Sequence, residues 1–404
     1  MNSDLPVAQS KSIPRSGRVA SIDAARGTAM LFVCLAHFTD SYFFPIGEEK
    51  IGSDLVTIGM VASPTFVIVS GLVAGFLFAT RRNSFGDLQR KLFDRGLFLL
   101  IIGHLLLAMA GFAAGLRFAT AFRAEYITDA IAFAIMLGPW LLKVFGAGRR
   151  LSLAAAIFAL DWLAVLFWTP SSGFAILVKT YLIGVVSPDG WGSTAGGFAI
   201  LPWFSVYLTG TVIGQRIGSY YASDARAAAH LFLARIGATC MALSLTTKAA
   251  LVLLSRFPVI AARVSNLLHV VAPYQKFPPG PIYLCFFGGT GILLLAAVLE
   301  LGRRDHAQVL LKPLRQIGLA SFFVYIVQFY LYSVVLRRLR FPYTPLWPLL
   351  FIASLALLAS LATLWNSKAG NEYLTVGVAA LLKRVARNRR RIVEKPLLVE
   401  MGSS

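Results

Sequence analysis

The most constraining feature of this sequence is a series of apolar runs, each about 20 residues long, the length at which a helix crosses the hydrocarbon core of a bilayer. Hydrophobic residues make up 57% of the 404 residues, and charged residues only 14%. So few charged side chains do not cover a water-soluble surface. The sequence therefore predicts an all-α integral membrane protein and excludes a soluble enzyme, a disordered chain and a secreted domain.

A bundle of about ten transmembrane helices is expected. The predicted ranges are 22–44, 55–79, 92–115, 126–145, 151–169, 198–217, 231–255, 281–301, 316–336 and 345–366. The segment 170–187 has a shorter apolar run, which Lys179 interrupts. We expect an interfacial or re-entrant piece there, and an eleventh membrane-spanning helix is the alternative.

The distribution of basic residues predicts the orientation. If both termini face the cytoplasm, the cytoplasmic segments hold 27 Lys and Arg and the outer segments hold 10. Cytoplasmic loops carry such an excess, so we predict N-in, C-in topology for a multi-pass protein of the cell inner (plasma) membrane. Residues 1–20 and 367–404 then form cytoplasmic tails, and residues 21–366 form the membrane domain.

The net charge of +20 also comes from the excess of Lys and Arg in the predicted cytoplasmic segments. In a soluble protein it would suggest nucleic acid, but here the lipid bilayer is the expected partner, and no nucleic acid is expected. The C-terminal run KRVARNRRRIVEK is interpreted as a solvated tail that touches anionic headgroups. A contribution to binding a phosphorylated cytoplasmic cofactor is the alternative.

No metal is expected. The three cysteines, Cys34, Cys240 and Cys285, each lie inside an apolar run and have no partner at ligand spacing. Neither a disulfide framework nor a zinc site is supported.

The first predicted helix carries four ionisable residues, Asp23, Arg26, His37 and Asp40. Arg26 and His37 are eleven residues apart, or three turns plus about 20°, and therefore share one face about 16 Å apart along the axis. Asp23 and Asp40 flank the same stripe at a spacing of three residues. Charged groups inside a bilayer are costly, so this seam predicts a functional site. The alternative is an end cap formed by Asp23 and Arg26, with His37 as a hydrogen-bonded core residue.

An Arg and a His separated by ten residues, in the context RVASIDAARG, resemble a pattern of the transmembrane acyltransferase superfamily. This superfamily includes the acyltransferase-three family, the glucan succinyltransferases and the heparan-α-glucosaminide N-acetyltransferase type. Four further stretches are similar: SPTFVIVSGLVAGFLFATRR, ILPWFSVYLTGTVIG, KFPPGPIYLCFFGG and IGLASFFVYIVQFYLY. The resemblance covers most of residues 18–366.

The resemblance implies an enzyme of ten or eleven helices. Such an enzyme takes an acyl group from cytoplasmic acyl-coenzyme A, its donor substrate, and delivers it to an acceptor at or beyond the outer face. The acceptor is often a saccharide of the cell envelope. By this resemblance His37 matches the essential histidine, and Arg26 matches its paired arginine. Arg90, Lys91 and Arg95 lie where relatives carry a basic cluster thought to meet the coenzyme.

The sequence departs from the family pattern at three positions. Gln328 stands where many relatives have His, and Gly280 stands where many have Ser. Asp94 lowers the net positive charge of the basic cluster. The pair on the first helix is unaffected.

The chemistry of His37 agrees with acyl transfer. A hydroxyl or amine that attacks a thioester needs a base, and a neutral imidazole suits this role near pH 7. A covalent acyl carrier is an alternative role for His37. Arg26 could pair with Asp23 or hold the polar arm of the coenzyme, while Asp40 could orient the imidazole.

Other polar residues inside the apolar runs have weaker interpretations. His104 is isolated, and a core histidine bonded to a backbone or hydroxyl group is at least as plausible as a catalytic one. Asp161 and Lys248 both fall near the middle of the membrane, and we expect them to neutralise each other.

Aromatic and amide side chains are the candidates for acceptor binding. We assign Trp203, Tyr207 and Gln328 to the substrate site, and Trp191 could also stack on a sugar. Aromatic residues are equally typical of membrane interfaces.

Two other functions compete with an enzyme. A transporter would use the polar seam of the first helix as a proton or substrate path, although no internal repeat is evident. A catalytically degenerate envelope scaffold is the other alternative, because of Gln328.

Overall fold

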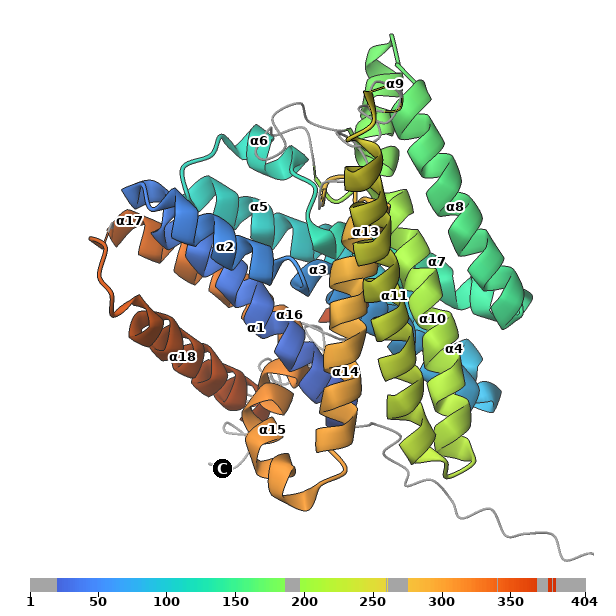
Figure 1. Cartoon of the computed structure of the whole chain (residues 1–404). Helices are drawn as coiled ribbons and strands as arrows, with labels where there is room; N and C mark the ends of the chain where they lie inside the picture. Colours follow the sequence, from blue (N-terminus) through green and yellow to red (C-terminus); the bar gives the residue numbers. More distant parts are fainter. Residues whose placement is uncertain are drawn as a thin grey trace, which may run out of the picture.

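The structure is a computed structural model that describes residues 20–185, 197–258, 260, 275–339, 341–368, 377–379 and 381–382. Within these ranges the chain forms helices joined by turns, and no β-strand occurs (Figure 1). Most of the two predicted tails, and also Trp191, lie outside the described residues.

The helices of the first half are α1 (Ala20–Tyr42), α2 (Glu49–Gly59), α3 (Ala62–Thr80), α4 (Phe85–Phe98), α5 (His104–Ala113), α6 (Phe118–Arg123), α7 (Ile127–Val144) and α8 (Ala147–Phe167). Those of the second half are α9 (Gly173–Val178), α10 (Ile200–Ala222), α11 (Arg226–Leu254), α13 (Pro281–Tyr283), α14 (Gly289–Leu301), α15 (Asp305–Leu319), α16 (Ser321–Phe329), α17 (Arg337–Leu339) and α18 (Trp347–Ser367). Short π-helical segments continue α4 into α5 at Leu99–Gly103, α13 into α14 at Leu284–Gly288, and α16 into α17 at Tyr330–Leu336.

Nine helical stretches within the described residues are long and apolar enough to cross a membrane. They correspond to nine of the ten predicted helices, with α2 and α3 together forming one stretch, Glu49–Thr80. The remaining predicted helix, 198–217, is present as α10 but is not among the nine. The prediction of a polytopic all-α membrane protein is confirmed.

Two predicted helix boundaries are wrong. The helix predicted over 316–336 is divided at Ala320, where α15 ends and α16 begins. The helix predicted to begin at 92 begins instead at Phe85, which is buried and packs edge-on against Phe78 with 4.9 Å between ring centroids. Apolar-run length misses both features, because α15 and the first turns of α4 are amphipathic and bury only one face.

The described part of the segment 170–187, residues 170–185, does not form a long helix. Its apolar helix, Gly173–Ile183, has fewer than 18 residues and is too short to span. The Lys179 ammonium folds back and donates to the carbonyls of Val165, at 3.2 Å, and Trp168 in the last turn of α8. The lysine that interrupts the apolar run therefore caps a neighbouring helix, where the free carbonyls favour a cation.

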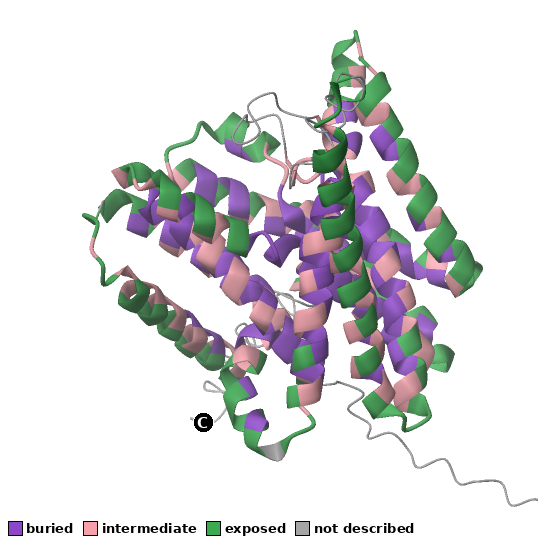
Figure 2. Ribbon diagram, viewed as in Figure 1, coloured by how far each residue is buried: buried purple, intermediate pink, exposed green. Residues whose placement is uncertain are grey.

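The core centres on α3, which packs closely against α10 and also contacts α1, whereas α11 and α18 are largely exposed (Figure 2). Gly71 and Gly75 of α3 face Gly210 and Gly214 of α10. A Cβ atom at any of these positions would overlap a backbone carbonyl of the opposite helix. These small residues allow the two backbones to touch, which is how helices associate tightly in a membrane.

We call one end of the bundle the inner end. It contains the turns at 81–84, 145–146, 223–225 and 302–304, and it is the end predicted to be cytoplasmic. The opposite, outer end contains α2, α6, α9 and α13 (Figure 1).

Candidate active site

The first turns of α1 are fixed by close packing against α15. Gly27 lies against the backbone of Leu314, and Gly318 lies against the backbone of Asp23, so neither position has room for a side chain. The Asp23 carboxylate is buried, and its Oδ1 lies 3.8 Å from Nη1 of Arg26. An ion pair with Asp23, one of the two roles considered for Arg26, is therefore present at the inner end of α1.

A cavity of about 420 Å³, the inner cavity, opens at this end of the bundle. Three arginines from three helical segments line it, namely Arg26 of α1, Arg81 at the end of α3 and Arg95 of α4. Asp23 is the acidic residue among its lining side chains, and apolar residues of α3, α4 and α7 complete the wall. The excess of guanidinium groups favours an anionic ligand.

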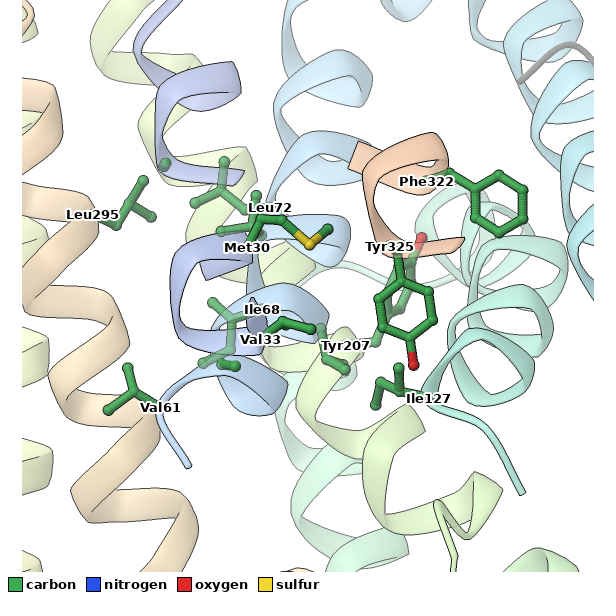
Figure 3. Packing of buried hydrophobic residues seen from close by; sticks show 14 of the residues in the cluster. Met30, Val33, Val61, Ile68, Leu72, Ile127, Tyr207, Leu295, Phe322 and Tyr325 are labelled. Atoms are coloured by element: carbon green, nitrogen blue, oxygen red, sulfur yellow. The ribbon is translucent and has the colours of Figure 1, made fainter. Parts of the chain in front are cut away.

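A second cavity of about 100 Å³, the middle cavity, continues from the first toward the centre of the bundle. The two cavities share lining residues, among them Arg26 and Arg95. The middle cavity extends to Val33 of α1 and to Tyr325 of α16, which points toward Ile127 of α7 in Figure 3. The buried Thr128 hydroxyl also lines it and has no hydrogen-bond partner within the described structure.

His37 lies one helical turn beyond the middle cavity, because it follows Val33 by four residues on α1. Its ring packs edge-on against Phe329, with 5.2 Å between centroids. Among the described residues, neither ring nitrogen makes a hydrogen bond or ion pair with a protein group. In particular, Asp40 is exposed and does not bond to His37. The cation that acts electrostatically on the Asp40 carboxylate is Arg337.

The structure separates the three basic residues predicted to form one cluster. Arg95 lines both cavities, whereas Arg90 lines a different groove between α4 and α7. Lys91 is exposed and does not line any of these three spaces. Asp94 has a separate role: its Oδ1 accepts a hydrogen bond of 3.0 Å from the backbone N–H of Ala379, so the C-terminal segment returns to α4.

The residues assigned to acceptor binding are all fully buried, and one of them reaches a cavity. Trp203 packs between Phe198 and Tyr283, with centroid separations of 5.6 and 6.5 Å. Gln328 donates through Nε2 to the Tyr325 carbonyl at 3.1 Å. Tyr207 lines the inner cavity and therefore faces the arginines rather than the outer end.

A buried arginine lies behind Tyr207. Arg150, at the start of α8, is completely inaccessible and donates to Thr211 Oγ1 at 2.7 Å and to Gln215 Oε1, both on α10. Its charge also acts on the Tyr207 hydroxyl. Arg150 thus joins α8 to α10 beside the inner cavity.

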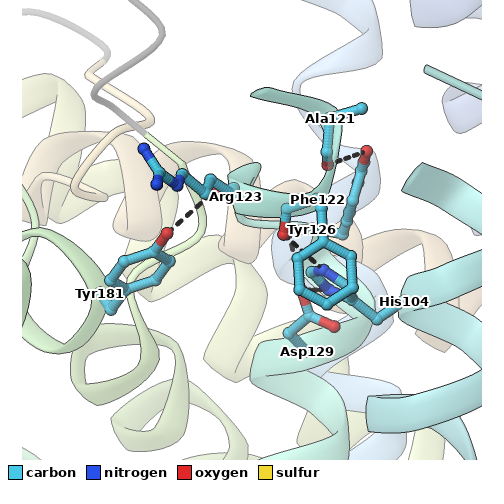
Figure 4. Close-up of polar contacts among 7 residues, drawn as sticks. All are labelled: His104, Ala121, Phe122, Arg123, Tyr126, Asp129 and Tyr181. Carbon is cyan, nitrogen blue, oxygen red and sulfur yellow. Dashed lines mark hydrogen bonds and ion pairs between the residues drawn. The ribbon is translucent and has the colours of Figure 1, made fainter. Parts of the chain in front are cut away.

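His104 joins three helices at the outer side of the bundle (Figure 4). Its Nδ1 lies 3.0 Å from Asp129 Oδ2, and its Nε2 lies 2.8 Å from the Phe122 carbonyl oxygen. A ring with both nitrogens protonated donates to both acceptors. This geometry agrees with the interpretation of His104 as a hydrogen-bonded core residue that links α5, α6 and α7.

The predicted neutralisation of Asp161 by Lys248 is wrong. Asp161 is buried in α8, and neither of its carboxylate oxygens has a hydrogen-bond partner in the described structure. The neighbouring residue, Trp162, donates instead to the Pro279 carbonyl at 3.2 Å. Counting residues along each helix placed the two charges at the same depth in the membrane. It could not show which neighbouring helix each side chain faces.

The loop before α13 carries a lysine that sequence analysis did not single out. The Lys276 ammonium lies 5.2 Å from the ring centroids of both Phe198 and Phe277, which pack edge-on at 5.0 Å. Burial lowers the pKa of Lys276 to about 8. This ammonium is also the charge that acts electrostatically on His37.

Arg81, Ser70, Ser321 and Tyr325 are further cavity residues that were not assigned to the site. All four lie within stretches quoted above for the family resemblance, so their presence in those stretches was the available signal. Among the described residues, no group of three His, Cys, Asp or Glu side chains could hold a metal ion.

Comparison with known families identifies this arrangement. A family model described as an acyltransferase domain, Acyl_transf_3, matches residues 19–365. The chain belongs to the acyltransferase-three family. The match begins at the start of α1 and ends within α18, so the membrane bundle of this acyltransferase is the family domain. Comparison with curated proteins finds no match.

Proposed function

We propose that this acyltransferase takes an acyl group from acyl-coenzyme A at the inner end and delivers it to a hydroxyl or amine at the outer side of the membrane. A saccharide of the cell envelope is the proposed acceptor. The observation that carries this proposal is the continuity of the inner and middle cavities, which lead from three arginines to within one turn of His37.

The arginines are suited to the polar end of the donor. Coenzyme A carries phosphate groups, and guanidinium groups bind phosphate through paired, charge-assisted hydrogen bonds. With these phosphates near Arg81 and Arg95, the pantetheine arm would pass Arg26 into the narrower middle cavity. The polar groups of Ser70, Ser321 and Thr128 line that path and can bond the amides of the arm.

His37 then acts as the general base. It takes the proton of the acceptor hydroxyl or amine, and the acceptor atom forms a bond to the thioester carbonyl carbon. The resulting oxyanion collapses as the carbon–sulfur bond breaks, and the proton on the imidazole passes to the departing thiolate. Because no protein group within the described structure occupies its ring nitrogens, His37 is available to the acceptor.

Lys276 supports the developing negative charge in this scheme. Its ammonium lies on the outer side of the site and acts on His37. A cation held in place near a forming oxyanion lowers the barrier without reorganisation. The neighbouring rings of Phe198 and Phe277 present apolar faces on which a sugar can stack.

Purified protein in proteoliposomes tests the proposal. Acetyl- and succinyl-coenzyme A, each labelled in the acyl group, are supplied at one face, and a saccharide extract is supplied at the other. We expect release of free thiol and labelling of the saccharide, both lost in His37→Ala. Labelled donor that crosses the membrane with its thioester intact would instead indicate a transporter, and no turnover with any acceptor would favour a scaffold.

A further inference from the structure

A groove between α4 and α7 lies at the inner end of the bundle and has no role in the proposed reaction. Its volume is about 400 Å³, and we call it the α4–α7 groove. It is lined by Gly86, Asp87, Gln89, Arg90, Phe93, Trp140 and Lys143. The two helices that form it lie side by side at one edge of the bundle (Figure 1).

The groove is equipped with hydrogen-bond donors. Gln89 is only 4% exposed, and its Nε2 amide has no hydrogen-bond partner within the described structure. The Lys143 ammonium reaches over the start of α4, 3.7 Å from the position that a Cβ of Gly86 would occupy. Arg90 adds a second cation, and Asp87 is the one acid in the lining. A buried amide donor left without an acceptor is costly, so it points to an acceptor in the ligand.

The groove and the inner cavity lie on opposite faces of α4. Leu88, Leu92 and Arg95 line the inner cavity, whereas Arg90 and Phe93 line the groove. At about 100° per residue, these two sets are roughly 160° apart around the helix. A donor bound in the inner cavity therefore does not reach the groove through the bundle, and the groove needs a ligand of its own.

The surroundings of the groove indicate a ligand from the membrane. Trp140 is 56% exposed, Phe93 39% and the neighbouring Val144 68%, so apolar side chains flank the polar lining on the outside of the bundle. Exposed aromatics beside basic residues are typical of the level of the lipid headgroups. Basic residues at the cytoplasmic surface attract anionic lipids.

We propose that the α4–α7 groove binds the phosphate headgroup of an anionic phospholipid from the inner leaflet. Arg90 and Lys143 neutralise the phosphate, and the Gln89 amide donates to one of its oxygens. Trp140 and Phe93 contact the glycerol and the first carbons of the acyl chains. The inference does not depend on the proposed reaction, because no residue of the groove lines the inner or the middle cavity.

Native mass spectrometry of the detergent-purified full chain tests this site, with phosphatidylglycerol and phosphatidylcholine as probes. Wild-type protein should retain phosphatidylglycerol preferentially. The double variant Arg90→Gln/Lys143→Gln should bind it about 30-fold more weakly, as expected for the loss of two interfacial cations. Lys91→Gln is the matched control, since it removes an exposed cation of the same helix that lies outside the groove, and it should bind like wild type.

Two further measurements keep the test decisive. Gln89→Leu should also weaken phosphatidylglycerol binding while leaving both cations in place, and unfolding temperatures without added lipid will show that each variant is folded. Equal binding by wild type and by the folded double variant would overturn the proposal. So would a double variant that keeps phosphatidylglycerol but loses affinity for coenzyme A, because the groove would then belong to the donor.

Discussion

Arg26 of α1 and Arg95 of α4 line the same two cavities, although they come from helices that are separated in the sequence by the whole of α2 and α3. Their side chains stand at the passage from the wide inner cavity to the narrow middle cavity. A ligand that passes from one cavity to the other must therefore pass both guanidinium groups.

This placement predicts different effects for two arginines of one helix. Arg95→Gln should raise the apparent KM for acyl-coenzyme A about tenfold or more, because a charge-assisted hydrogen bond to the donor is lost. Arg90→Gln, a matched change on the opposite face of α4, should leave KM within about twofold. Initial rates against donor concentration measure both values. Equal increases in KM would mean that the donor contacts both faces of α4, and the two-cavity path would be wrong.

The positions of the polar residues along the first helix could be predicted from the sequence. Which residues of the basic cluster face the bundle could not. Helical periodicity places Arg26 toward the inner end and His37 a fixed distance outward, and both positions are as expected. Arg90, Lys91 and Arg95 are close in sequence, yet successive residues point in different directions around a helix. Which of them faces the bundle depends on the packing of α4 against α7 and on the cavity that α1, α3 and α4 enclose together.

The second prediction concerns His37. Replacement by Ala should lower kcat by about 10²–10⁴-fold, the range for loss of a general base. The unfolding temperature should change little, because the ring makes no hydrogen bond to the described protein. Acyl transfer by the purified variant measures the effect, and His230→Ala, near the inner start of α11 and outside both cavities, serves as a control. Turnover near the wild-type value would exclude His37 as the base.

His104 is predicted to contribute to stability and not to chemistry. Asp129→Asn removes the charge opposite its Nδ1 and should lower the free energy of unfolding by about 2 kcal/mol, the scale of a hydrogen bond to a charged group. The variant should keep wild-type kcat at a temperature where it is folded. Thermal unfolding in detergent and initial rates check the two statements separately. A large fall in kcat with unchanged stability would instead assign His104 to the reaction.

Topology is a further prediction, resting on the split of basic residues. An alkaline phosphatase fusion after residue 404 should be inactive, and a green fluorescent protein fusion at the same place should fluoresce, because both termini are expected inside. The short helix Gly173–Ile183 agrees with this prediction, since an additional span there would reverse the second half. Alkaline phosphatase activity at the C-terminus would show that the orientation is wrong.

The polar residues whose roles could not be predicted from the sequence are mostly those that contact residues far away along the chain. Lys276 lies in a loop rich in proline, and only the folded chain brings its ammonium to 5.2 Å from the ring centroid of Phe198. Asp161 shows the opposite error, since its depth suggested a charged partner that the packing does not provide. Apolar run length predicts where helices lie, but the neighbours of each face follow from tertiary contacts.

The final prediction is a pH dependence that arises from Lys276. Burial lowers its pKa to about 8, so the ammonium is present below that pH and is lost above it. If this cation stabilises the oxyanion, kcat/KM should fall as the pH rises through about 8. Lys276→Arg should move this decline to higher pH, because a guanidinium stays charged. Lys276→Met should have lower kcat/KM and no decline near pH 8.

As the pH rises through about 8, the contribution of Lys276 to stability should rise while kcat/KM falls. This difference distinguishes loss of the cation from unfolding as the cause of lower activity. Between pH 8 and the ordinary lysine pKa near 10.5, the unfolded chain keeps the proton that the folded chain has released. The unfolded state then binds more protons, so the contribution of Lys276 to the free energy of unfolding rises with pH. Wild type should thus lose activity above pH 8 without a parallel fall in stability relative to Lys276→Met. An alkaline decline in kcat/KM that persists unchanged in Lys276→Met would assign the titration to another group.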